Sequence, residues 1–364
     1  MSRTRDWISL SLAPGLGPVA FWHLVNLFGS PTRVLDMDWG GLKHHSGLGK
    51  RQINGLKEVA RLREEADSEL DRLNRIGGHA IISDDPCYPE LLRTCVNPPP
   101  VLYVRGNKAC LNTDGVAVVG SRAATGYGRR IAFTLGRDLA ARGVTVVSGL
   151  ATGIDAEAHA GSLDGGGTTI GVLGCGLDVV YPRTNTRLYQ QVVDQGALVT
   201  EYGIGTRPEG FRFPARNRII AGMCYGVVVV EAAKKSGSLI TVQHALDEGR
   251  EVFAIPGQVD SVKSGGTHWL LQQGASLALS ASDIIDSLDL ETREATRVER
   301  EDVELDGETK LLFSFVENYP KQRDELIERS GLSPAKISEH LLLLELEGLI
   351  ELLPGDQVRR VVAS

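Results

Sequence analysis

Short apolar stretches alternate with amphipathic segments through the middle of the chain. Each apolar stretch has four or five residues and is rich in valine, isoleucine or threonine, a pattern typical of buried strands. These stretches are Val116–Val119, Val144–Val147, Thr169–Leu173, Ala197–Thr200, Val227–Glu231 and Val252–Ile255. Apolar strands separated by amphipathic helices predict a doubly wound, mostly parallel α/β sheet, which is an extended Rossmann-like fold. We assign residues 76–290 to this domain and expect an extra strand within Pro98–Gly106.

The first 75 residues follow a helical pattern. Two glycine turns are each followed by an amphipathic stretch, at Pro14–Gly17 with Val19–Phe28 and at Ser46–Gly49 with Arg51–Leu62. A Gly-x-Gly turn that opens a helix resembles half of a helix-hairpin-helix unit, whose backbone amides can hold a DNA phosphate. An ordinary helical bundle is the alternative, and we favour it because only two basic residues flank these turns. Residues 1–75 are therefore expected to form a small helical domain of the SAM or helix-hairpin-helix type.

The C-terminal part begins with a charged run, residues 291–306, whose lack of apolar periodicity predicts a solvated linker. Residues 307–364 then show three helical patterns and a hairpin, which predict a winged-helix domain. The expected elements are Thr309–Asn318, Arg323–Ser330, Pro334–Glu347 and a hairpin over Leu349–Val361. The third helix carries Lys336 and His340 against three glutamates, whereas a helix that reads duplex DNA is basic. We therefore expect this domain to contact protein.

Composition narrows the function classes. The formal net charge of −7 argues against a protein that binds nucleic acid over its whole surface, although it allows a local basic groove. The longest apolar runs are far too short to cross a bilayer, and the first six residues lack the apolar core of a signal peptide. The five cysteines include no Cys-x-x-Cys pair. A cytoplasmic protein without a membrane partner is the expectation.

The segment Val116-Ala-Val-Val-Gly-Ser-Arg122 looks like the first strand and turn of a nucleotide-binding sheet. Arg122, however, occupies the position at which a dinucleotide fingerprint needs its second glycine, the one that lets the pyrophosphate approach the backbone. A guanidinium at this position can bind phosphate oxygens directly. We therefore expect Gly120, Ser121 and Arg122 to seat a phosphate of a nucleic-acid backbone.

Positive charge gathers between residues 207 and 235 of this acidic chain. The region has six cations, Arg207, Arg212, Arg216, Arg218, Lys234 and Lys235, against the two anions Glu209 and Glu231. Phe211 and Phe213 lie among the arginines, and aromatic faces beside phosphate-binding charges suit single-stranded nucleic acid. Arg216, Asn217 and Arg218 are expected at a helix start. Ser236 or Ser238 is expected to cap the next helix, whose free amides offer a further phosphate seat.

Candidates for catalysis are sparse. Thr152 and Asp155 have the spacing of a capping box, and Asp155 and His159 lie one helical turn apart. An acid–base couple is one interpretation, but we favour a cap and a helix-surface pair because no nucleophile or metal-binding cluster accompanies them. Cys175 is expected to be a small buried thiol. The sequence has no P-loop and no zinc motif, so we expect neither a metal nor a cofactor.

Seven segments together carry a family resemblance. They are Gly120–Arg122, Ser148–His159, Gly171–Pro182, Phe213–Gly222, Ser236–Thr241, Val252–Gly257 and Gly265–Ala275. In these segments the chain strongly resembles the DNA-processing protein A family, abbreviated DprA and also called Smf. The flanking domains are similar to one common architecture of that family.

The resemblance implies a cytoplasmic bacterial homodimer that binds single-stranded DNA and loads the RecA recombinase onto it during natural transformation, without catalysis. It implies that Gly120, Ser121 and Arg122 seat a phosphate. It also implies that the DNA pocket is lined by Phe213, Arg216, Asn217, Arg218, Lys234, Ser236 and Gly237. A basic residue that the family often places shortly before the Phe-Pro step is missing at Gly210, and Arg212 is its expected substitute.

Two rival functions remain open. A Rossmann-type enzyme that processes nucleotides, similar to a phosphoribohydrolase, would need an acidic residue near a phosphate loop, and Glu201 and Glu231 at strand ends are its candidates. The second rival is an architectural adaptor that works through the winged helix.

Overall fold

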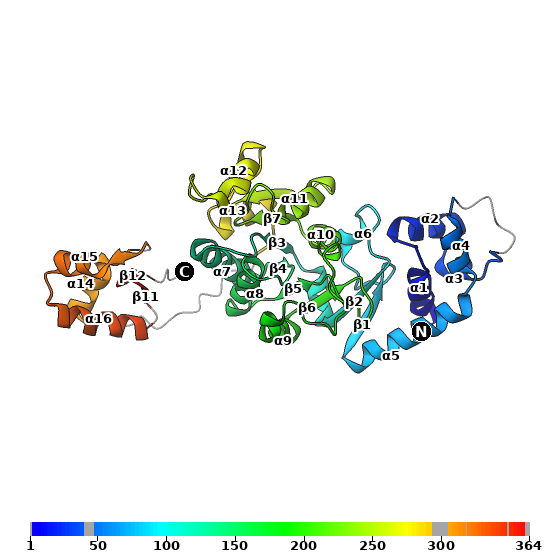
Figure 1. Cartoon of the computed structure of the whole chain (residues 1–364), viewed down its shortest axis with the longest axis horizontal. Coiled ribbons are helices and arrows are strands. Elements are labelled where there is room, and N and C mark those ends of the chain that lie inside the picture. The colour runs from blue at the N-terminus through cyan, green and yellow to red at the C-terminus, as the bar shows by residue number, and fades with distance from the viewer. Residues whose placement is uncertain (1, 40–46, 293–304, 318, 348, 361–364) are drawn as a thin grey trace. The chain divides into compact units, whose positions relative to one another are not determined.

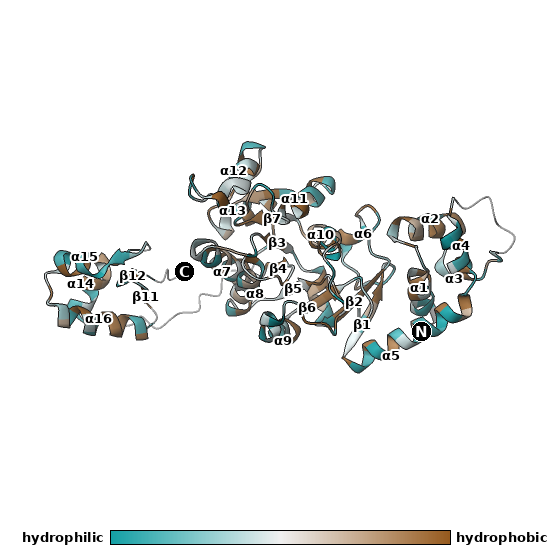
Figure 2. Cartoon of the chain, viewed as in Figure 1, coloured by the Kyte–Doolittle hydropathy of each residue, from teal (hydrophilic) through white to brown (hydrophobic). Residues whose placement is uncertain are grey.

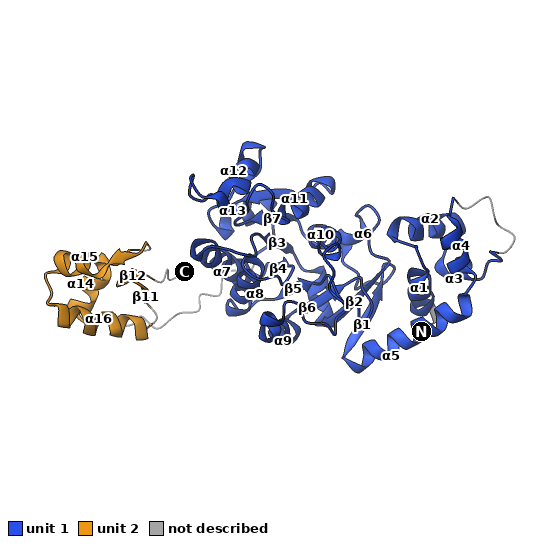
Figure 3. Cartoon of the chain, in the orientation of Figure 1, with its two compact units in different colours: residues 1–296 blue, residues 297–364 orange. Residues whose placement is uncertain are grey.

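The computed structural model describes residues 2–39, 47–292, 305–317, 319–347 and 349–360. The chain forms two compact units, residues 1–296 and 297–364 (Figure 3). Most of the predicted linker, residues 293–304, lies outside the described residues, as do Ser46, Asn318 and Val361. The proposed boundary between residues 75 and 76 falls inside the first unit and stays a prediction.

The N-terminal segment is helical over α1 (Ser2–Leu12), α2 (Pro18–Phe28), α3 (Pro31–Leu35), α4 (Lys50–Leu56) and α5 (Val59–Arg75). The amphipathic stretch Arg51–Leu62 is divided between two helices, because α4 ends at Leu56 and α5 begins at Val59. The sequence near this break contains Asn54 and Gly55, which are poor helix formers. Trp7, Phe21 and Trp22 pack together with ring centroids 5.4–5.8 Å apart, and the Trp22 indole donates a hydrogen bond to the carbonyl of Pro98 at 2.7 Å.

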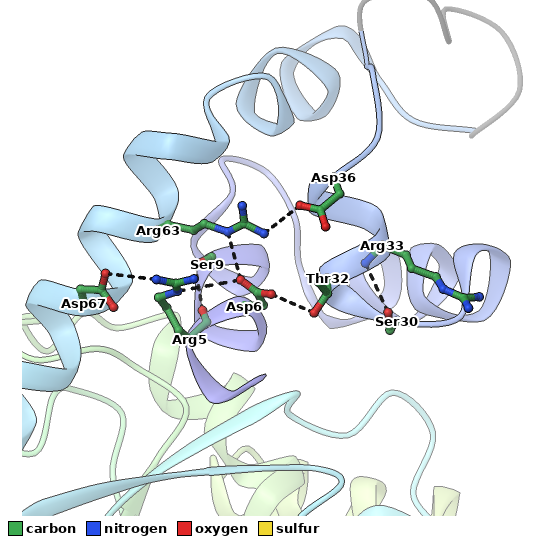
Figure 4. A network of polar contacts seen from close by, with 9 residues as sticks. All are labelled: Arg5, Asp6, Ser9, Ser30, Thr32, Arg33, Asp36, Arg63 and Asp67. Carbon is green, nitrogen blue, oxygen red and sulfur yellow. Dashed lines mark hydrogen bonds and ion pairs between the residues drawn. The ribbon is translucent and has the colours of Figure 1, made fainter. Parts of the chain in front are cut away.

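A buried carboxylate ties three of these helices together (Figure 4). Asp6 on α1 is only 4% exposed and accepts hydrogen bonds from the Thr32 hydroxyl of α3 at 2.8 Å and from the Arg63 guanidinium of α5 at 3.0 Å. Arg63 also donates to Asp36 at 2.8 Å. Hydrogen bonds between charged groups are stronger than neutral ones, so this network fixes the packing of α1, α3 and α5.

The predicted mostly parallel α/β sheet is confirmed (Figure 1). Among the described residues the sheet has nine strands in the order β1-β2-β6-β5-β4-β3-β7-β8-β9. The strands are β1 (Gly78–Ile82), β2 (Val101–Gly106), β3 (Gly115–Val119), β4 (Thr145–Ser148), β5 (Thr169–Val172), β6 (Ala197–Thr200), β7 (Gly226–Val229), β8 (Glu251–Ala254) and β9 (Ser276–Leu277). All neighbours from β6 to β9 pair in parallel, whereas β1 and β2 form an antiparallel edge. Sequence reasoning missed β1 and β9.

Alternating residues of the strands face two hydrophobic layers. Val116 and Val118 of β3 belong to the layer with α7 (Gly126–Ala141), α8 (Ile154–Asp164) and α13 (Ala281–Leu288). Ala117 and Val119 belong to the opposite layer with α10 (Arg212–Gly222) and α11 (Ser238–Asp247). The remaining helices of this unit are α6 (Glu90–Arg93), α9 (Thr186–Gln195) and α12 (Gly265–Gln272).

Strand β3 lies at the point where the strand order reverses. The chain proceeds from β3 to β4, β5 and β6 on one side and returns to β7 on the other. In open α/β sheets this arrangement leaves a crevice outside the carboxyl ends of the central strands, where ligands bind.

The second unit is a winged helix, as predicted. It contains α14 (Gly307–Phe315), α15 (Arg323–Ser330), α16 (Pro334–Leu346) and a hairpin of β11 (Ile350–Leu353) and β12 (Gln357–Arg360), with β10 (Lys321–Gln322) pairing to β12. Its core includes Leu312, Leu326, Ile337 and Leu341. The first helix ends at Phe315, earlier than the expected Asn318.

Candidate nucleic-acid interface

A cleft of about 600 Å³ opens beyond the carboxyl ends of the central strands. Every segment that lines it follows a strand at this edge of the sheet. The lining residues are Val119, Gly120, Ser121, Arg122, Ala123, Ala151, Asp155, Tyr181, Pro208, Gly210, Phe213, Pro214, Arg216, Asn217, Ile220, Ala233, Ser236, Gly237, Ser238 and Thr241. Strand order therefore gathers five separate stretches of the sequence into one site.

The cleft brings together most of the residues expected from the sequence. Those that line it are Gly120, Ser121, Arg122, Phe213, Arg216, Asn217, Ser236 and Gly237. Three expected residues, Arg212, Arg218 and Lys234, are not among the lining residues. Their role in binding stays a prediction.

A cation and two aromatic rings stack inside the cleft. The guanidinium carbon of Arg122 lies 5.4 Å from the centroid of the Phe213 ring. Tyr181 stacks on Phe213 with ring centroids 5.3 Å apart and an interplanar angle of 29°. Sequence reasoning missed Tyr181, although its position after a parallel strand would have placed it at the same sheet edge. The stack joins a group that attracts phosphate to flat faces that suit bases.

Arg216 lies at the floor of the cleft and is only 4% exposed. Its guanidinium donates hydrogen bonds to the carbonyl of Gly149 at 2.9 Å and to that of Val172. Burial lowers the pKa of Arg216, and the nearby charge of Asp155 opposes this shift. The absence of a side chain at Gly149 makes room for the guanidinium, which a Cβ atom at this position would displace. Arg216 is thus a buried cation of the cleft lining, and Asp155 is its nearby counter-charge.

The helix carrying Arg216 begins earlier than expected. Helix α10 starts at Arg212, so Arg216, Asn217 and Arg218 lie beyond its first turn and not at a helix start. The backbone amide of Arg212 bonds the carbonyl of Glu209 at 2.9 Å, which shows that the chain already turns before the helix. Because both residues lie in α10, Phe213 and Arg216 are about one helical turn apart, and both line the cleft.

The expected capping box and surface pair on α8 are both wrong. Helix α8 begins at Ile154 after Gly153, and the Thr152 hydroxyl donates instead to the carbonyl of Arg122 at 3.3 Å. The Asp155 carboxylate accepts the backbone N–H groups of Gly149 and Ala151 at 3.2 and 3.4 Å. Burial raises the pKa of Asp155, while Arg216 acts in the opposite direction.

His159 is fully buried and bonds Thr169, not Asp155. The Thr169 hydroxyl donates to the carbonyl of Val146 at 2.7 Å, so it accepts the Nδ1 proton of His159 at 2.6 Å. The Nε2 atom has no hydrogen-bond partner within the described residues. Burial lowers the pKa of His159 to about 3, with a smaller contribution from Arg216.

A carboxylate of the chain itself occupies the amino end of α7. Glu231 is 4% exposed and accepts the N–H of Thr125 at 2.9 Å, while the Thr125 hydroxyl accepts the N–H of Gly128 at 3.1 Å. In a nucleotide-binding sheet this helix end holds the phosphate. The turn Gly120–Arg122 lines the cleft, but two N–H groups at the helix end behind it already have acceptors within the chain, and one of these acceptors is a carboxylate.

The expectation that Ser236 or Ser238 caps α11 is wrong, because the N-cap residue is Gly237 and no side chain caps the helix. The helix begins at Ser238, and the Ser236 hydroxyl accepts the N–H of Ser238 at 3.3 Å. The two hydroxyls lie 2.8 Å apart. Ser236 thus contributes a hydrogen bond at the helix start, next to Gly237 in the cleft lining.

Much of the positive charge counted from the sequence is paired. Arg218 forms an ion pair with Glu201, and Arg212 lies 3.5 Å from Glu209. The Arg212 guanidinium also lies over the rings of Tyr202 and Phe211, at 5.4 and 5.3 Å from their centroids. Sequence reasoning missed Lys263, whose Nζ donates to the Ser121 hydroxyl at 3.4 Å. Its position after β8 is the signal, because that strand ends at the same edge.

The two carboxylates that the enzymatic hypothesis needs are engaged elsewhere. Glu201 pairs with Arg218, and Glu231 bonds the amino end of α7. Among the cleft-lining residues of the described chain, Asp155 is the only acid. Cys175 is buried, and burial raises the pKa of its thiol to about 11. Across the described ranges no cluster of His, Cys, Asp and Glu suits a metal ion, and no helix is long and apolar enough to cross a membrane.

Family models match both units of the chain. Residues 79–289 match the family described as DNA recombination-mediator protein A, and residues 297–356 match the DprA winged helix domain. Protein Smf of Escherichia coli K12 is 40% identical over 323 residues, covering 86% of this chain and 85% of the relative. DNA processing protein DprA of Streptococcus pneumoniae R6 is 47% identical over 201 residues, covering 55% and 71%.

Two solved structures are also similar. The X-ray structure of DprA from Streptococcus pneumoniae superposes with a TM-score of 0.70 at 35% identity, covering 78% of this chain and 97% of that one. A structure of DNA processing protein A from Helicobacter pylori superposes with a TM-score of 0.54 at 29% identity, covering 59% and 97%. The Helicobacter pylori protein is described as having a unique single-stranded DNA binding mode.

Proposed function

Because the chain belongs to the DNA recombination-mediator protein A family, we propose that it binds single-stranded DNA in the cleft above β3 and β7. The observation that carries this proposal is the stack of Arg122, Phe213 and Tyr181 in the cleft wall. The rings of the stack can pack against the faces of DNA bases, and its guanidinium can pair with a phosphate. The binding mode described for the Helicobacter pylori relative supports the same ligand.

The alternatives to a single strand have less support. A duplex reader needs a broad basic surface, whereas this chain has a net charge of −7 and pairs Arg212 and Arg218 with glutamates. A dinucleotide needs the amino end of α7, which Glu231 already occupies. A nucleotide hydrolase needs a carboxylate free to act in the cleft, and Asp155 is held by two backbone amides.

The rest of the proposed function follows from family membership. In this proposal the protein is a cytoplasmic mediator without catalysis that loads RecA onto incoming DNA during natural transformation. It acts as a homodimer. Exposed leucines near the β9 edge of the sheet, Leu246 at 57%, Leu277 at 53% and Leu279 at 70%, support self-association at this edge.

The proposal is tested by titrating fluorescein-labelled oligo-dT with the full-length protein, followed by photocrosslinking and peptide mapping. We expect saturable binding that unlabelled duplex DNA displaces poorly, with crosslinks in peptides that contain Phe213 or Tyr181. Crosslinks confined to residues 305–360 would instead support the winged-helix adaptor. Incubation with nucleoside monophosphates provides the enzymatic control, and release of free base would support the hydrolase.

A further inference from the structure

The third helix of the winged-helix unit leaves leucines in solvent. Helix α16 buries Ile337, Leu341 and Leu344 in the core of the unit. On its other sides Leu342 is 55% exposed, Leu343 is 44% exposed and Leu346 is 75% exposed. Leu342 and Leu346 are four residues apart and so share one helical face. Figure 2 colours much of the carboxyl-terminal half of α16 brown, because buried and exposed leucines both lie in this half.

A fourth exposed leucine lies on the helix that packs beside it. Leu311 of α14 is 46% exposed. The two helices are joined by Lys336 and Glu308 at 2.7 Å and by the Thr309 hydroxyl and His340 Nδ1 at 2.8 Å. We call Leu311, Leu342, Leu343 and Leu346 the leucine patch. Exposed leucines clustered on packed helices are typical of a binding surface, whereas single exposed leucines are ordinary.

Acidic residues outnumber basic ones around the leucine patch, where the further cations are Arg323 of α15, which bonds Ser338 of α16, and the exposed Lys310 of α14. Glu339, Glu345 and Glu347 are exposed on α16 or at its end. The one lysine of this helix, Lys336, is already paired with Glu308 of α14. This charge repels the phosphates of DNA, and it also repels the same face of a second copy of the chain. It attracts a partner that carries lysine or arginine around an apolar stripe.

We propose that the leucine patch is a docking site for a basic amphipathic helix of a partner protein. Leucine-like side chains of that helix, spaced three or four residues apart, contact Leu342 and Leu346. Its flanking cations pair with Glu339 and Glu345. The site belongs to the second unit alone and does not depend on the DNA cleft. Its test is therefore independent of the test of the proposed function.

The test uses the full-length protein and two fluorescein-labelled model helices with the same leucine pattern. One has lysine at all polar positions, and the other has glutamate. We expect the leucine/lysine peptide to bind the wild-type protein and to bind the double variant Leu342→Ser/Leu346→Ser about tenfold more weakly. The double variant Glu339→Lys/Glu345→Lys, which changes only exposed side chains, is expected to reverse the preference between the two peptides.

Val259→Ser/Val262→Ser is the matched control, because these valines are 92% and 80% exposed in the first unit. Binding of the leucine/lysine peptide to this control at wild-type strength is expected. Unchanged peptide preference after charge reversal overturns the proposal. A dimer that dissociates only in the leucine variant, seen by light scattering, identifies a second copy as the occupant and also overturns it. Loss of duplex DNA binding in the variant Leu342→Ser/Leu346→Ser also overturns the proposal.

Discussion

The guanidinium of Arg122 lies over the ring of Phe213, 5.4 Å from its centroid, although the two residues come from different βα connections of the sheet. Arg122 follows β3, whereas Phe213 is in the first turn of α10. The contact orients both groups in the cleft wall before any ligand arrives. A preorganised cation and ring lose less conformational entropy on binding than two free side chains.

Replacing Phe213 by leucine tests the aromatic face. The substitution keeps an apolar side chain but removes the π-surface, and we expect the binding free energy for oligo-dT to weaken by about 1–3 kcal/mol. Phe211→Leu is the control, because Phe211 is 67% exposed and is not among the cleft-lining residues. Fluorescence anisotropy measures both. Equal losses in the two variants would show that the stack has no special role.

Arg122→Ala tests the phosphate contact. A side chain that neutralises one phosphate contributes to the dependence of binding on salt, so the slope of log K against log salt is expected to fall by about one unit. The affinity of this variant for oligonucleotides of several sequences is expected to fall by similar factors. Arg61→Ala on α5 is the control, since its guanidinium is exposed and pairs with Glu58 and Glu65. Parallel salt plots for Arg122→Ala and wild type would refute the contact.

His159 predicts a loss of stability in mild acid. Its pKa is about 3 in the folded chain and 6.5 for the free side chain, so the unfolded chain binds more protons between these values. Stability from this residue is complete above pH 6.5 and is lost as the pH falls towards 3. The loss between pH 7 and pH 5 is expected to be about 2 kcal/mol in free energy of unfolding.

The comparison variant is His159→Asn, whose amide N–H replaces the Nδ1 donor to Thr169 without a titrating ring. Urea unfolding at pH 7 and pH 5 is expected to show a smaller difference for this variant than for wild type. His79→Gln, at an exposed position where slight burial also lowers the pKa of the imidazole, is expected to reduce the difference less than His159→Asn does. A wild-type pH dependence in His159→Asn would assign the effect to other groups.

Replacing Glu231 is expected to reduce the stability of the fold. Glu231→Ala removes the charged acceptor of the Thr125 N–H, and we expect the free energy of unfolding to fall by about 1–3 kcal/mol. Glu231→Gln retains a carbonyl oxygen and is expected to lose less. Urea titration of both variants measures the difference. If alanine and glutamine are equally well tolerated, the hydrogen bond does not stabilise the helix start.

Asp6 tests the network in Figure 4. Asp6→Ala removes the shared acceptor of Thr32 and Arg63, and we expect a loss of about 2 kcal/mol in free energy of unfolding. Asp67→Ala is the matched control, because this exposed carboxylate lies 3.7 Å from Arg5 at the edge of the network. Similar urea midpoints for the two variants would contradict a special role for the buried carboxylate.

The sheet was predictable because its strands are continuous apolar runs with glycine turns between them. The strands that escaped prediction lie at its edges, where β9 has two residues and β1 pairs on one side only. Their patterns are too short or too mixed to stand out from loop sequence. The winged helix was predictable because, unlike these edge strands, its helices and hairpin make up most of the unit.

The candidate site was predictable in part. The residues at the ends of β3 and β7 could be assigned because parallel strands end at one edge. Burial of Asp155 and His159 could not, because it depends on how closely α7 and α8 pack. A side chain at Gly136 would collide with the backbone of Ala158, and one at Gly161 with the backbone of Phe133. This glycine-to-backbone contact buries a face of α8 that the sequence pattern alone leaves in solvent.

The carboxylate of Glu231 also bears on how the protein behaves among small metabolites. Soluble cofactors and energy carriers rely on an open helix end to hold their phosphates, and here a covalently attached anion takes that place. Under the proposed function, nucleotide cofactors therefore do not compete with DNA for this helix end. The occupancy of the cleft then depends on the supply of DNA strands and on ionic strength.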